Sequence, residues 1–371
     1  MIKVLHIIKS LGRGGAEMLL PETLKIHSTD QFEFHYIYFL PWKDQMVKTI
    51  ENEGGKVTCF PAKNNVKLLL QYKKVAEYCK REKIDLIHCH LPWAGFLGRL
   101  VFQKTKIPVL YTEHNMQERY HPVTKNLNKL TYNSQTLALG VSEDVTQSIQ
   151  KNIQPNIPVK TLLNGVNTNK FKSNKTNSSI RKEFNIPSDA VVIGNVAVFR
   201  FQKRLVEWLQ VFNEISQENN NCYGIIVGAG PLEKEIKDEL KRLNLEEKVF
   251  FPGLQTEVRP YFEAMDIFMM SSSFEGLPIA LLEAMSMECA VVSTNAGGIK
   301  EVIRKDKDGL TCDVEEWNKL SDLCQVLIDD PEKMQEMKKA ARERVINSFS
   351  LKKMVTELES YYSEHAKKQS N

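Results

Sequence analysis

The segment Ser271-Ser-Ser-Phe-Glu-Gly-Leu-Pro-Ile-Ala-Leu-Leu-Glu-Ala-Met285 is the most informative stretch of the chain for its fold. It follows the apolar run Ile267-Phe-Met-Met270, which predicts a buried strand, and it continues into a helix expected to begin near Leu277. A strand that leads through a short loop into a helix presents backbone N–H groups and the positive end of the helix dipole at the edge of a sheet. Such an edge suits a phosphate group.

Two carboxylates, Glu275 and Glu283, lie in this segment. A carboxylate two turns into the helix can accept hydrogen bonds from both hydroxyls of a ribose, and one in the loop can meet a second hydroxylated ring. The spacing resembles the Glu-x7-Glu motif of retaining GT-B glycosyltransferases, in particular those of glycosyltransferase family 4. The resemblance implies that Glu275 orients the donor sugar and Glu283 holds the ribose. It also implies donor contacts from the backbone of four neighbours, Gly276, Leu277, Ile279 and Ala280.

Apolar strand-like runs alternate with helical segments along the whole chain. They lie at 2–8, 32–39, 57–60, 85–89, 108–112, 137–141 and 159–163, and then at 191–198, 223–228, 248–252, 267–271 and 290–294. This rhythm predicts an α/β fold with two doubly wound parallel sheets, whose strand ends would face a common cleft. After residue 314 the pattern becomes helical, over about 315–329, 331–347 and 350–366.

The polar segment 167–189 separates the two series of strands and is interpreted as a linker. The expected domains are therefore 1–166 on the acceptor side and 190–349 on the nucleotide-sugar side. Resemblance to GT-B enzymes implies that the last helix, within 350–371, crosses back to the N-terminal domain.

Gly12-Arg-Gly-Gly-Ala-Glu17 follows the first strand and opens a helix. Glycines there allow close approach of the backbone to a diphosphate. A dinucleotide fingerprint is disfavoured because Glu17 replaces its third glycine and no acidic residue ends the second strand. The loop matches the family's Gly-x-Gly-Gly-x-Glu opening, which implies donor contacts from Gly14 and Gly15.

Three further motifs match the family in order along the chain. In Thr112-Glu-His-Asn115, the resemblance places His114 beside the donor sugar, where an imidazole can donate a hydrogen bond or assist proton movement near neutral pH. In Phe199-Arg-Phe-Gln-Lys-Arg204, it implies that Arg200 and Lys203 grip the diphosphate and stabilise the leaving nucleotide, although Arg200 is closer to the lysine than in many members. In Pro252-Gly-Leu-Gln255, Leu254 is the candidate contact to the nucleobase.

His88-Cys-His90 contains two residue types that bind zinc. We find no further Cys/His cluster in the sequence that would complete a tetrahedral set, so we expect no metal and assign His90 to the acceptor side of the cleft. Asp306-Lys-Asp308 spells the Asp-x-Asp pattern of metal-dependent transferases, but its hydrophilic Asp-Gly context predicts a turn.

Charge is distributed unevenly between the two halves. Residues 1–185 contain 27 Lys and Arg against 15 Asp and Glu, whereas residues 186–371 contain 23 against 31. A basic first half attracts anionic partners such as phosphoryl lipids or an anionic membrane surface. Nucleic acid is disfavoured because the basic residues are dispersed and no recognition motif accompanies them.

The cysteines and the apolar segments bear on location. The 7 cysteines show no paired spacing, which favours a reducing cytoplasm. The apolar start of the chain is interpreted as a strand and not as a signal peptide. No uncharged apolar stretch approaches the length of about 20 residues that spans a bilayer.

The resemblance implies a retaining glycosyltransferase that moves a sugar from a nucleoside diphosphate donor to an acceptor hydroxyl. The resemblance implies a UDP-linked donor, a lipid-linked or growing glycan acceptor of surface polysaccharide synthesis, no metal or other cofactor, and a cytoplasmic enzyme that can lie at the inner face of the membrane. Two alternatives remain open: a sugar-nucleotide enzyme of the same fold, such as an epimerase or a phosphorylase, and a non-catalytic transferase-like subunit.

Overall fold

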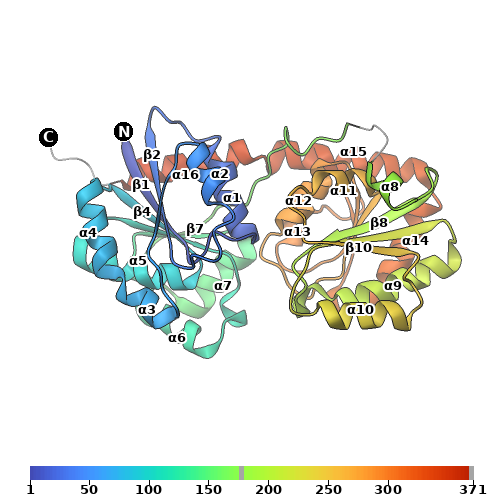
Figure 1. The fold of residues 1–371 in the computed structure, drawn as a ribbon, viewed down its shortest axis with the longest axis horizontal. Coiled ribbons are helices and arrows are strands. Elements are labelled where there is room, and N and C mark those ends of the chain that lie inside the picture. Colours follow the sequence, from blue (N-terminus) through green and yellow to red (C-terminus); the bar gives the residue numbers. More distant parts are fainter. Residues whose placement is uncertain (175–178, 367–371) are drawn as a thin grey trace. The chain divides into compact units, whose positions relative to one another are not determined.

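The computed structural model describes residues 1–174 and 179–366, which divide into two units, each with its own sheet (Figure 1). Unit 1 contains Met1–Asn164 together with the chain from Leu351 onward, and unit 2 contains Gly165–Ser350. Each unit is described by itself below.

Unit 1 is built on a seven-stranded parallel sheet of order β3-β2-β1-β4-β5-β6-β7. Its strands are β1 (Ile2–Ile7), β2 (Phe32–Tyr38), β3 (Lys56–Cys59), β4 (Leu86–His90), β5 (Val109–Glu113), β6 (Leu137–Gly140) and β7 (Val159–Thr161). Its helices are α1 (Gly15–Leu24), α2 (Val47–Asn52), α3 (Asn65–Leu70), α4 (Tyr72–Glu82), α5 (Pro92–Thr105), η1 (Gln117–Arg119), α6 (Pro122–Thr131), α7 (Glu143–Ile153) and α16 (Leu351–His365).

Unit 2 contains a six-stranded parallel sheet of order β10-β9-β8-β11-β12-β13. Its strands are β8 (Val191–Val196), β9 (Cys222–Val227), β10 (Val249–Gly253), β11 (Ile267–Met270), β12 (Ala290–Thr294) and β13 (Leu310–Cys312). Its helices are α8 (Ser179–Glu183), η2 (Phe201–Lys203), α9 (Leu205–Glu218), α10 (Glu233–Arg242), α11 (Arg259–Ala264), α12 (Ile279–Ser286), α13 (Ile299–Val302), η3 (Val314–Lys319), α14 (Leu320–Ile328) and α15 (Pro331–Ser348).

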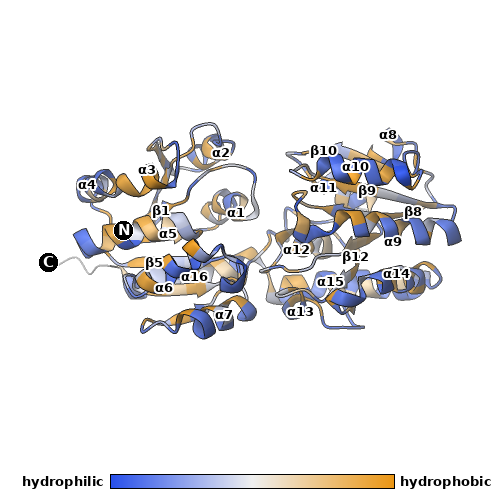
Figure 2. Ribbon diagram, turned by 90° about the horizontal axis from the view of Figure 1, so that it is seen from below, coloured by the Kyte–Doolittle hydropathy of each residue, from blue (hydrophilic) through white to orange (hydrophobic). Residues whose placement is uncertain are grey.

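Helices cover the sheets because the central strands are buried on both faces. In unit 1, β4 and β5 are buried along their full length, and in unit 2 the same holds for β11 and β12. Parallel strands of this kind need a helix layer on each side. The hydropathy colouring shows the complementary pattern on the helices, many of which carry hydrophilic residues along one side (Figure 2). The predicted α/β class with two doubly wound parallel sheets is therefore confirmed.

The last helix packs on unit 1. In α16, Leu358, Tyr361 and Tyr362 belong to one hydrophobic cluster of unit 1. The same cluster contains Val4 of β1 and Ile8, which follows that strand. Polar contacts add to this packing, since the Glu359 carboxylate lies 2.9 Å from Nδ1 of His27.

The segment interpreted as a linker, 167–189, is instead grouped with unit 2 in its described parts. Phe171 is buried, its ring meets that of Phe262 edge-on, and its carbonyl accepts a hydrogen bond of 2.6 Å from Ser286 Oγ. Phe184 of the same segment stacks on Phe250 with ring centroids 4.7 Å apart, so the polar composition concealed two anchoring aromatic side chains.

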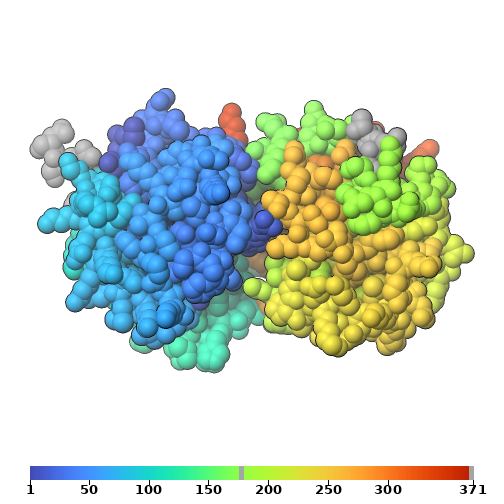
Figure 3. All heavy atoms as spheres, in the orientation of Figure 1, coloured from blue at the N-terminus to red at the C-terminus, as the bar shows by residue number. Residues whose placement is uncertain are grey.

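Side chains of the first part of the chain, blue to cyan in the space-filling view, cover most of the visible face of unit 1, and teal to green atoms from later residues form its lower end (Figure 3). Among the helices of residues 1–174 and 179–366, none has both the length and the apolar character required to cross a bilayer.

Candidate functional site

The carboxyl edge of the unit 2 sheet carries most of the predicted donor-binding residues. Strands β8 and β11 are neighbours, and each ends in a loop that leads to a helix. Arg200 and Lys203 follow β8, and Glu275 follows β11. Since parallel strands end at the same edge, residues far apart in the sequence meet there.

Lys203 and Glu275 form an ion pair. The Lys203 Nζ to Glu275 Oε1 distance is 2.5 Å, and the same Oε1 accepts a hydrogen bond of 2.7 Å from Ser272 Oγ. Sequence reasoning assigned the lysine to the diphosphate and the glutamate to the sugar, and it did not predict that the two contact each other. An ammonium group has three N–H donors. Lys203 can therefore keep Glu275 as one partner while it donates to a phosphate oxygen.

The two loops are joined by hydrogen bonds that fix the position of this pair. Ser271 Oγ lies 3.0 Å from the carbonyl oxygen of Lys203 and 2.8 Å from that of Arg204. The Ser273 N–H donates to the carbonyl of Gln202 at 2.8 Å. Ser271 and Ser273 therefore hold the loop that contains Lys203 against the loop that contains Glu275 by hydrogen bonds.

Gly297, in the Asn295-Ala-Gly-Gly298 turn, packs directly beneath Glu275. Its backbone has φ +55°, and a Cβ added there would lie 2.1 Å from the carbonyl oxygen of Glu275. A side chain at this position is excluded both by the left-handed conformation and by the contact.

We expect Gly297→Ala to displace Glu275 and to lower both sugar transfer and the free energy of unfolding, the latter by more than about 1 kcal/mol. Gly54→Ala is a matched control, since Gly54 also has a positive φ of +85° but nothing lies within 4 Å of its added Cβ. Urea unfolding and initial transfer rates measure the two effects. Equal losses in both variants would mean that the contact with Glu275 is unimportant.

Glu283 lies in α12, which begins at Ile279 after Pro278 and not near Leu277 as expected. Glu283 is therefore about one turn into the helix instead of two, and it is buried with 8% of its surface exposed. Proline disfavours the helical conformation in the residue before it, so Leu277 stays outside the helix. Gly276 and Leu277 consequently belong to the loop, whereas Ile279 and Ala280 form the first turn.

Arg200 and Leu254 are exposed at the same edge of unit 2. Arg200 precedes η2, and Leu254 follows β10 with 55% of its surface exposed. β10 pairs with β9, and the turn after β9 contacts the end of β10, because the Gly228 N–H donates to the carbonyl of Gly253. Exposure leaves both side chains accessible to a ligand.

In unit 1, the glycine loop after β1 is covered by its own acidic residue. Ser10 Oγ donates to Glu17 Oε1 at 3.0 Å, and a Cβ on Gly14 would lie 2.3 Å from the other Glu17 oxygen. Gly14 caps α1, which begins at Gly15. A carboxylate beside these glycines repels an anion, so Glu17 opposes the predicted approach of a diphosphate to this loop.

His114 follows β5, as the motif requires, and its Nε2 is buried with no hydrogen-bond partner among the described residues. Burial lowers the pKa of His114 to about 4. The ring is therefore neutral near pH 7, which favours hydrogen bonding to a ligand over the proton transfer considered from the sequence. The ring centroids of His114 and His90 are 6.1 Å apart, so the two predicted histidines lie on the same side of unit 1.

Glu113 is a buried residue that sequence reasoning did not assign. Its carboxylate accepts hydrogen bonds from Tyr111 Oη at 3.0 Å, from Gln117 Nε2 at 2.5 Å and from the hydroxyl of Tyr120, as well as from the N–H of His114 at 3.2 Å. It thereby ties the segment after β5 to the strand that positions His114. The sequence did contain a signal for Glu113, because a charged residue at the end of an apolar strand is unusual.

Burial raises the pKa of Glu113 to about 7, although hydrogen bonds from Tyr120 and Tyr111 oppose the shift. Because this pKa is above that of the unfolded chain, the folded state binds the extra proton as pH falls through about 7. We expect the wild type to gain stability relative to Glu113→Gln by up to about 3 kcal/mol between about pH 8 and pH 5. Urea unfolding at both pH values measures this difference, and a constant difference would contradict a buried, titrating Glu113.

Comparisons with known proteins give matches over most of the chain. Residues 27–170 match the family model described as Glycosyltransferase Family 4, and residues 176–344 match that described as Glycosyl transferases group 1. The chain is 28% identical over 297 residues to N-acetyl-alpha-D-glucosaminyl L-malate synthase of Bacillus anthracis, covering 78% of this chain and 77% of the relative. It is 22% identical over 380 residues to UDP-Gal:alpha-D-GlcNAc-diphosphoundecaprenol alpha-1,3-galactosyltransferase of Escherichia coli, covering 97% of this chain and 96% of the relative.

The fold is shared with solved glycosyltransferases. The crystal structure of Anabaena Alr3699/HepE in complex with UDP and glucose superimposes with a TM-score of 0.86 at 19% identity, covering 98% of this chain and all of the other. A glycosyltransferase from Rickettsia africae gives a TM-score of 0.84 at 20% identity, with 99% of each chain covered. The two family models, the curated relatives and the GT-B neighbours together show that the chain is an enzyme of glycosyltransferase family 4.

Proposed function

We propose that the enzyme transfers a sugar from a nucleoside diphosphate sugar, of the UDP class, to a hydroxyl of a lipid-linked or growing glycan with retention of configuration. The observation that supports this most is the Lys203–Glu275 pair at the carboxyl edge of unit 2, next to a strand–loop–helix segment. Relatives and neighbours with UDP in their names, and relatives named for diphosphoundecaprenol-linked acceptors from Escherichia coli and Campylobacter jejuni, support the donor and acceptor classes.

In the proposed donor complex, the diphosphate lies against Lys203 and Arg200. The ribose hydroxyls donate to Glu283, the nucleobase contacts Leu254, and the sugar ring meets Glu275. The amides of the loop and first turn of α12 add N–H donors.

During transfer, the bond between the anomeric carbon and the phosphate oxygen breaks while the acceptor oxygen bonds to the same face of that carbon. The acceptor proton passes to the departing phosphate oxygen, so the products are a glycoside and a nucleoside diphosphate. Lys203 and Arg200 stabilise the negative charge that grows on the diphosphate, a contribution that requires no divalent metal there. His114, as a neutral imidazole, hydrogen-bonds to the sugar near the reacting carbon.

The direct test uses the wild-type enzyme with a panel of UDP-sugars and undecaprenyl-diphosphate-linked sugars, in buffer without magnesium or manganese. Proton NMR of the product is expected to show the same anomeric configuration as the donor. An inverted product, or conversion of the donor with no acceptor present, would exclude retaining transfer and favour an epimerase.

An exposed basic face of unit 1 supports association with an anionic membrane. Helices α3 and α6 lie on either side of α5 (Figure 2). Each of the two exposes two apolar side chains, and exposed lysines lie on the same helices and near them. The apolar residues are Val66, Leu70, Val123 and Leu130, and the exposed lysines are Lys63, Lys67, Lys73, Lys74, Lys104 and Lys129. Apolar groups between basic ones match a surface of anionic headgroups over acyl chains.

We expect the double variant Lys67→Glu/Lys74→Glu to weaken binding to phosphatidylglycerol vesicles by at least about 30-fold, because each lysine near such a surface contributes about 1 kcal/mol. Lys241→Glu/Lys339→Glu reverses two exposed charges of unit 2 and is the matched control. Vesicle sedimentation at low salt measures both. If the wild type ignores anionic vesicles, the membrane part of the proposal is wrong.

A further inference from the structure

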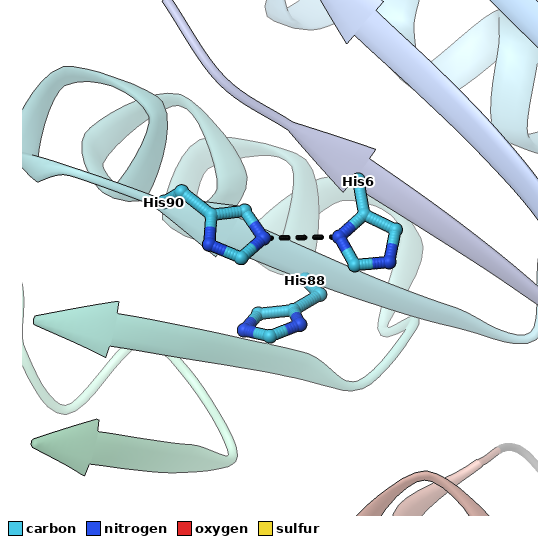
Figure 4. Close-up of side chains that lie close together, drawn as sticks. All are labelled: His6, His88 and His90. Carbon is cyan, nitrogen blue, oxygen red and sulfur yellow. Dashed lines mark hydrogen bonds between the residues drawn. The ribbon is translucent and has the colours of Figure 1, made fainter. Parts of the chain in front are cut away.

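Three histidines meet on one face of the unit 1 sheet. His6 comes from β1, and His88 and His90 come from β4 (Figure 4). The two strands are parallel neighbours in which His6 is the register partner of His88. Because side chains two residues apart in a strand lie on the same face, His90 joins the other two. Only the pair in β4 is recognisable in the sequence, because the neighbour of that strand is a property of the fold.

The ring nitrogens are close enough for a common ligand. His6 Nδ1 and His90 Nε2 are 2.9 Å apart, and one nitrogen from each of the three rings lies within 4.8 Å of the other two. A tetrahedral zinc ion with Zn–N bonds of about 2.0–2.1 Å holds its nitrogen ligands about 3.4 Å apart. The observed separations, 2.9 Å for one pair and no more than 4.8 Å for the others, bracket this value.

The surroundings keep the rings in the form that binds metals. His6, His88 and His90 are exposed by only 2%, 1% and 7% of their surface. Burial lowers the pKa of all three, that of His88 to about 3. Neutral imidazole has a free lone pair on one nitrogen and is the metal-binding form.

His88 is also held by hydroxyl groups from two other elements. Its Nδ1 lies 2.7 Å from the Tyr362 hydroxyl of α16, and its Nε2 lies 2.7 Å from Thr112 Oγ1 of β5. If one nitrogen binds an ion, the other remains hydrogen-bonded. This is the outer contact that usually orients a metal-binding histidine.

A small cavity beside the rings leaves space for one more ligand. It has a volume of about 20 Å³ and is lined by the three histidines and by Thr112, His114 and Asn164, among other residues. About 10–15 Å³ is enough for one water molecule. Three protein ligands with a water in the fourth position form a common arrangement for zinc.

We propose that His6, His88 and His90 bind one transition-metal dication of the zinc class, with a water molecule as the fourth ligand. Three nitrogen ligands without a carboxylate favour zinc, copper, nickel or cobalt over magnesium or calcium. The site goes beyond the proposed function, in which no step uses a metal ion. Its three protein ligands belong to unit 1, whereas Lys203 and Arg200 belong to unit 2.

The test uses the full-length wild type, stripped with a chelator and titrated with zinc by calorimetry. We expect one ion per chain, and X-ray absorption at the zinc edge is expected to show three imidazole nitrogens and one oxygen. His6→Gln and His88→Gln are each expected to weaken binding by more than about 100-fold, because loss of even an outer partner costs about 10- to 100-fold. His121→Asn is the control, since it removes an exposed histidine and retains a helix-capping side chain.

Absence of zinc uptake by the wild type would overturn the proposal, as would sulfur ligands in the absorption spectrum or unchanged affinity in variants whose circular dichroism shows that they are folded. If a histidine variant fails to fold, the proposal is tested by the ligands that X-ray absorption shows around zinc in the wild type. None of these readouts depends on sugar transfer, so failure of the metal site and failure of the proposed function are distinguishable.

Discussion

Lys203→Met is expected to slow sugar transfer by about 100- to 1000-fold, which is the usual cost of removing one group that stabilises charge in a transition state. In the proposed reaction this lysine meets the negative charge that develops on the departing diphosphate. Its position is well defined, because it is paired with Glu275 at 2.5 Å and its carbonyl accepts a hydrogen bond from Ser271. Methionine retains most of the volume of the side chain and removes only the charge and the N–H donors. Initial rates at saturating donor and acceptor measure the loss.

Two matched variants separate catalysis from support of the loop. Lys203→Arg keeps the positive charge and is expected to recover part of the rate, whereas Glu275→Gln leaves the lysine in place without its charged partner. If Lys203 only anchors Glu275, the Lys203→Met and Glu275→Gln variants will lose equal amounts of activity and the double variant will lose no more than either. A larger loss in Lys203→Met, with an unchanged urea midpoint, would support a direct contact with the diphosphate.

Glu283→Ala is expected to weaken binding of a UDP-sugar by about 100-fold or more, because two hydrogen bonds to a charged acceptor contribute about 1.5–3 kcal/mol each. The donor is also expected to lose its stabilising effect on thermal unfolding. For the wild type at about 100 times the dissociation constant, that effect is about 2.7 kcal/mol. Calorimetry and thermal shift with the same UDP-sugar measure the two quantities.

Glu288→Ala is the matched control for this variant. Glu288 lies just beyond α12 and is partly exposed. Its Oε1 lies 3.8 Å from Nε of Arg342, so the two side chains form an ion pair. Its removal is expected to leave donor affinity unchanged. Unaltered affinity in Glu283→Ala would show that the ribose assignment is wrong, whatever the result for Lys203.

The fold was largely predictable because its strands are short apolar runs separated by turn-forming and polar residues. The predicted run 290–294 coincides with β12, and 191–198 differs from β8 only at its end. The errors arose where one residue overrides the local composition. Phe171 anchors a polar segment to unit 2, and Pro278 shifts the start of α12.

The site was predictable in its residue types and not in its contacts. Strand–loop–helix motifs identified Lys203 and Glu275 as individual candidates, but their ion pair depends on β8 and β11 being neighbours. His6 and His88 are 82 residues apart in the sequence. His6 was therefore missed as well, because its contact with His88 depends on β1 and β4 being neighbours in the sheet. Glu113 was overlooked because its importance lies in burial and in its four hydrogen-bond donors, neither of which appears in a sequence pattern.

A crystal structure of the enzyme with a bound UDP-sugar tests the central claim most directly. We expect a phosphate oxygen about 2.8 Å from Lys203 Nζ, as in other charge-assisted hydrogen bonds, with the ribose hydroxyls at the Glu283 carboxylate. A diphosphate bound with neither Lys203 nor Glu283 within hydrogen-bonding distance of the donor would contradict it.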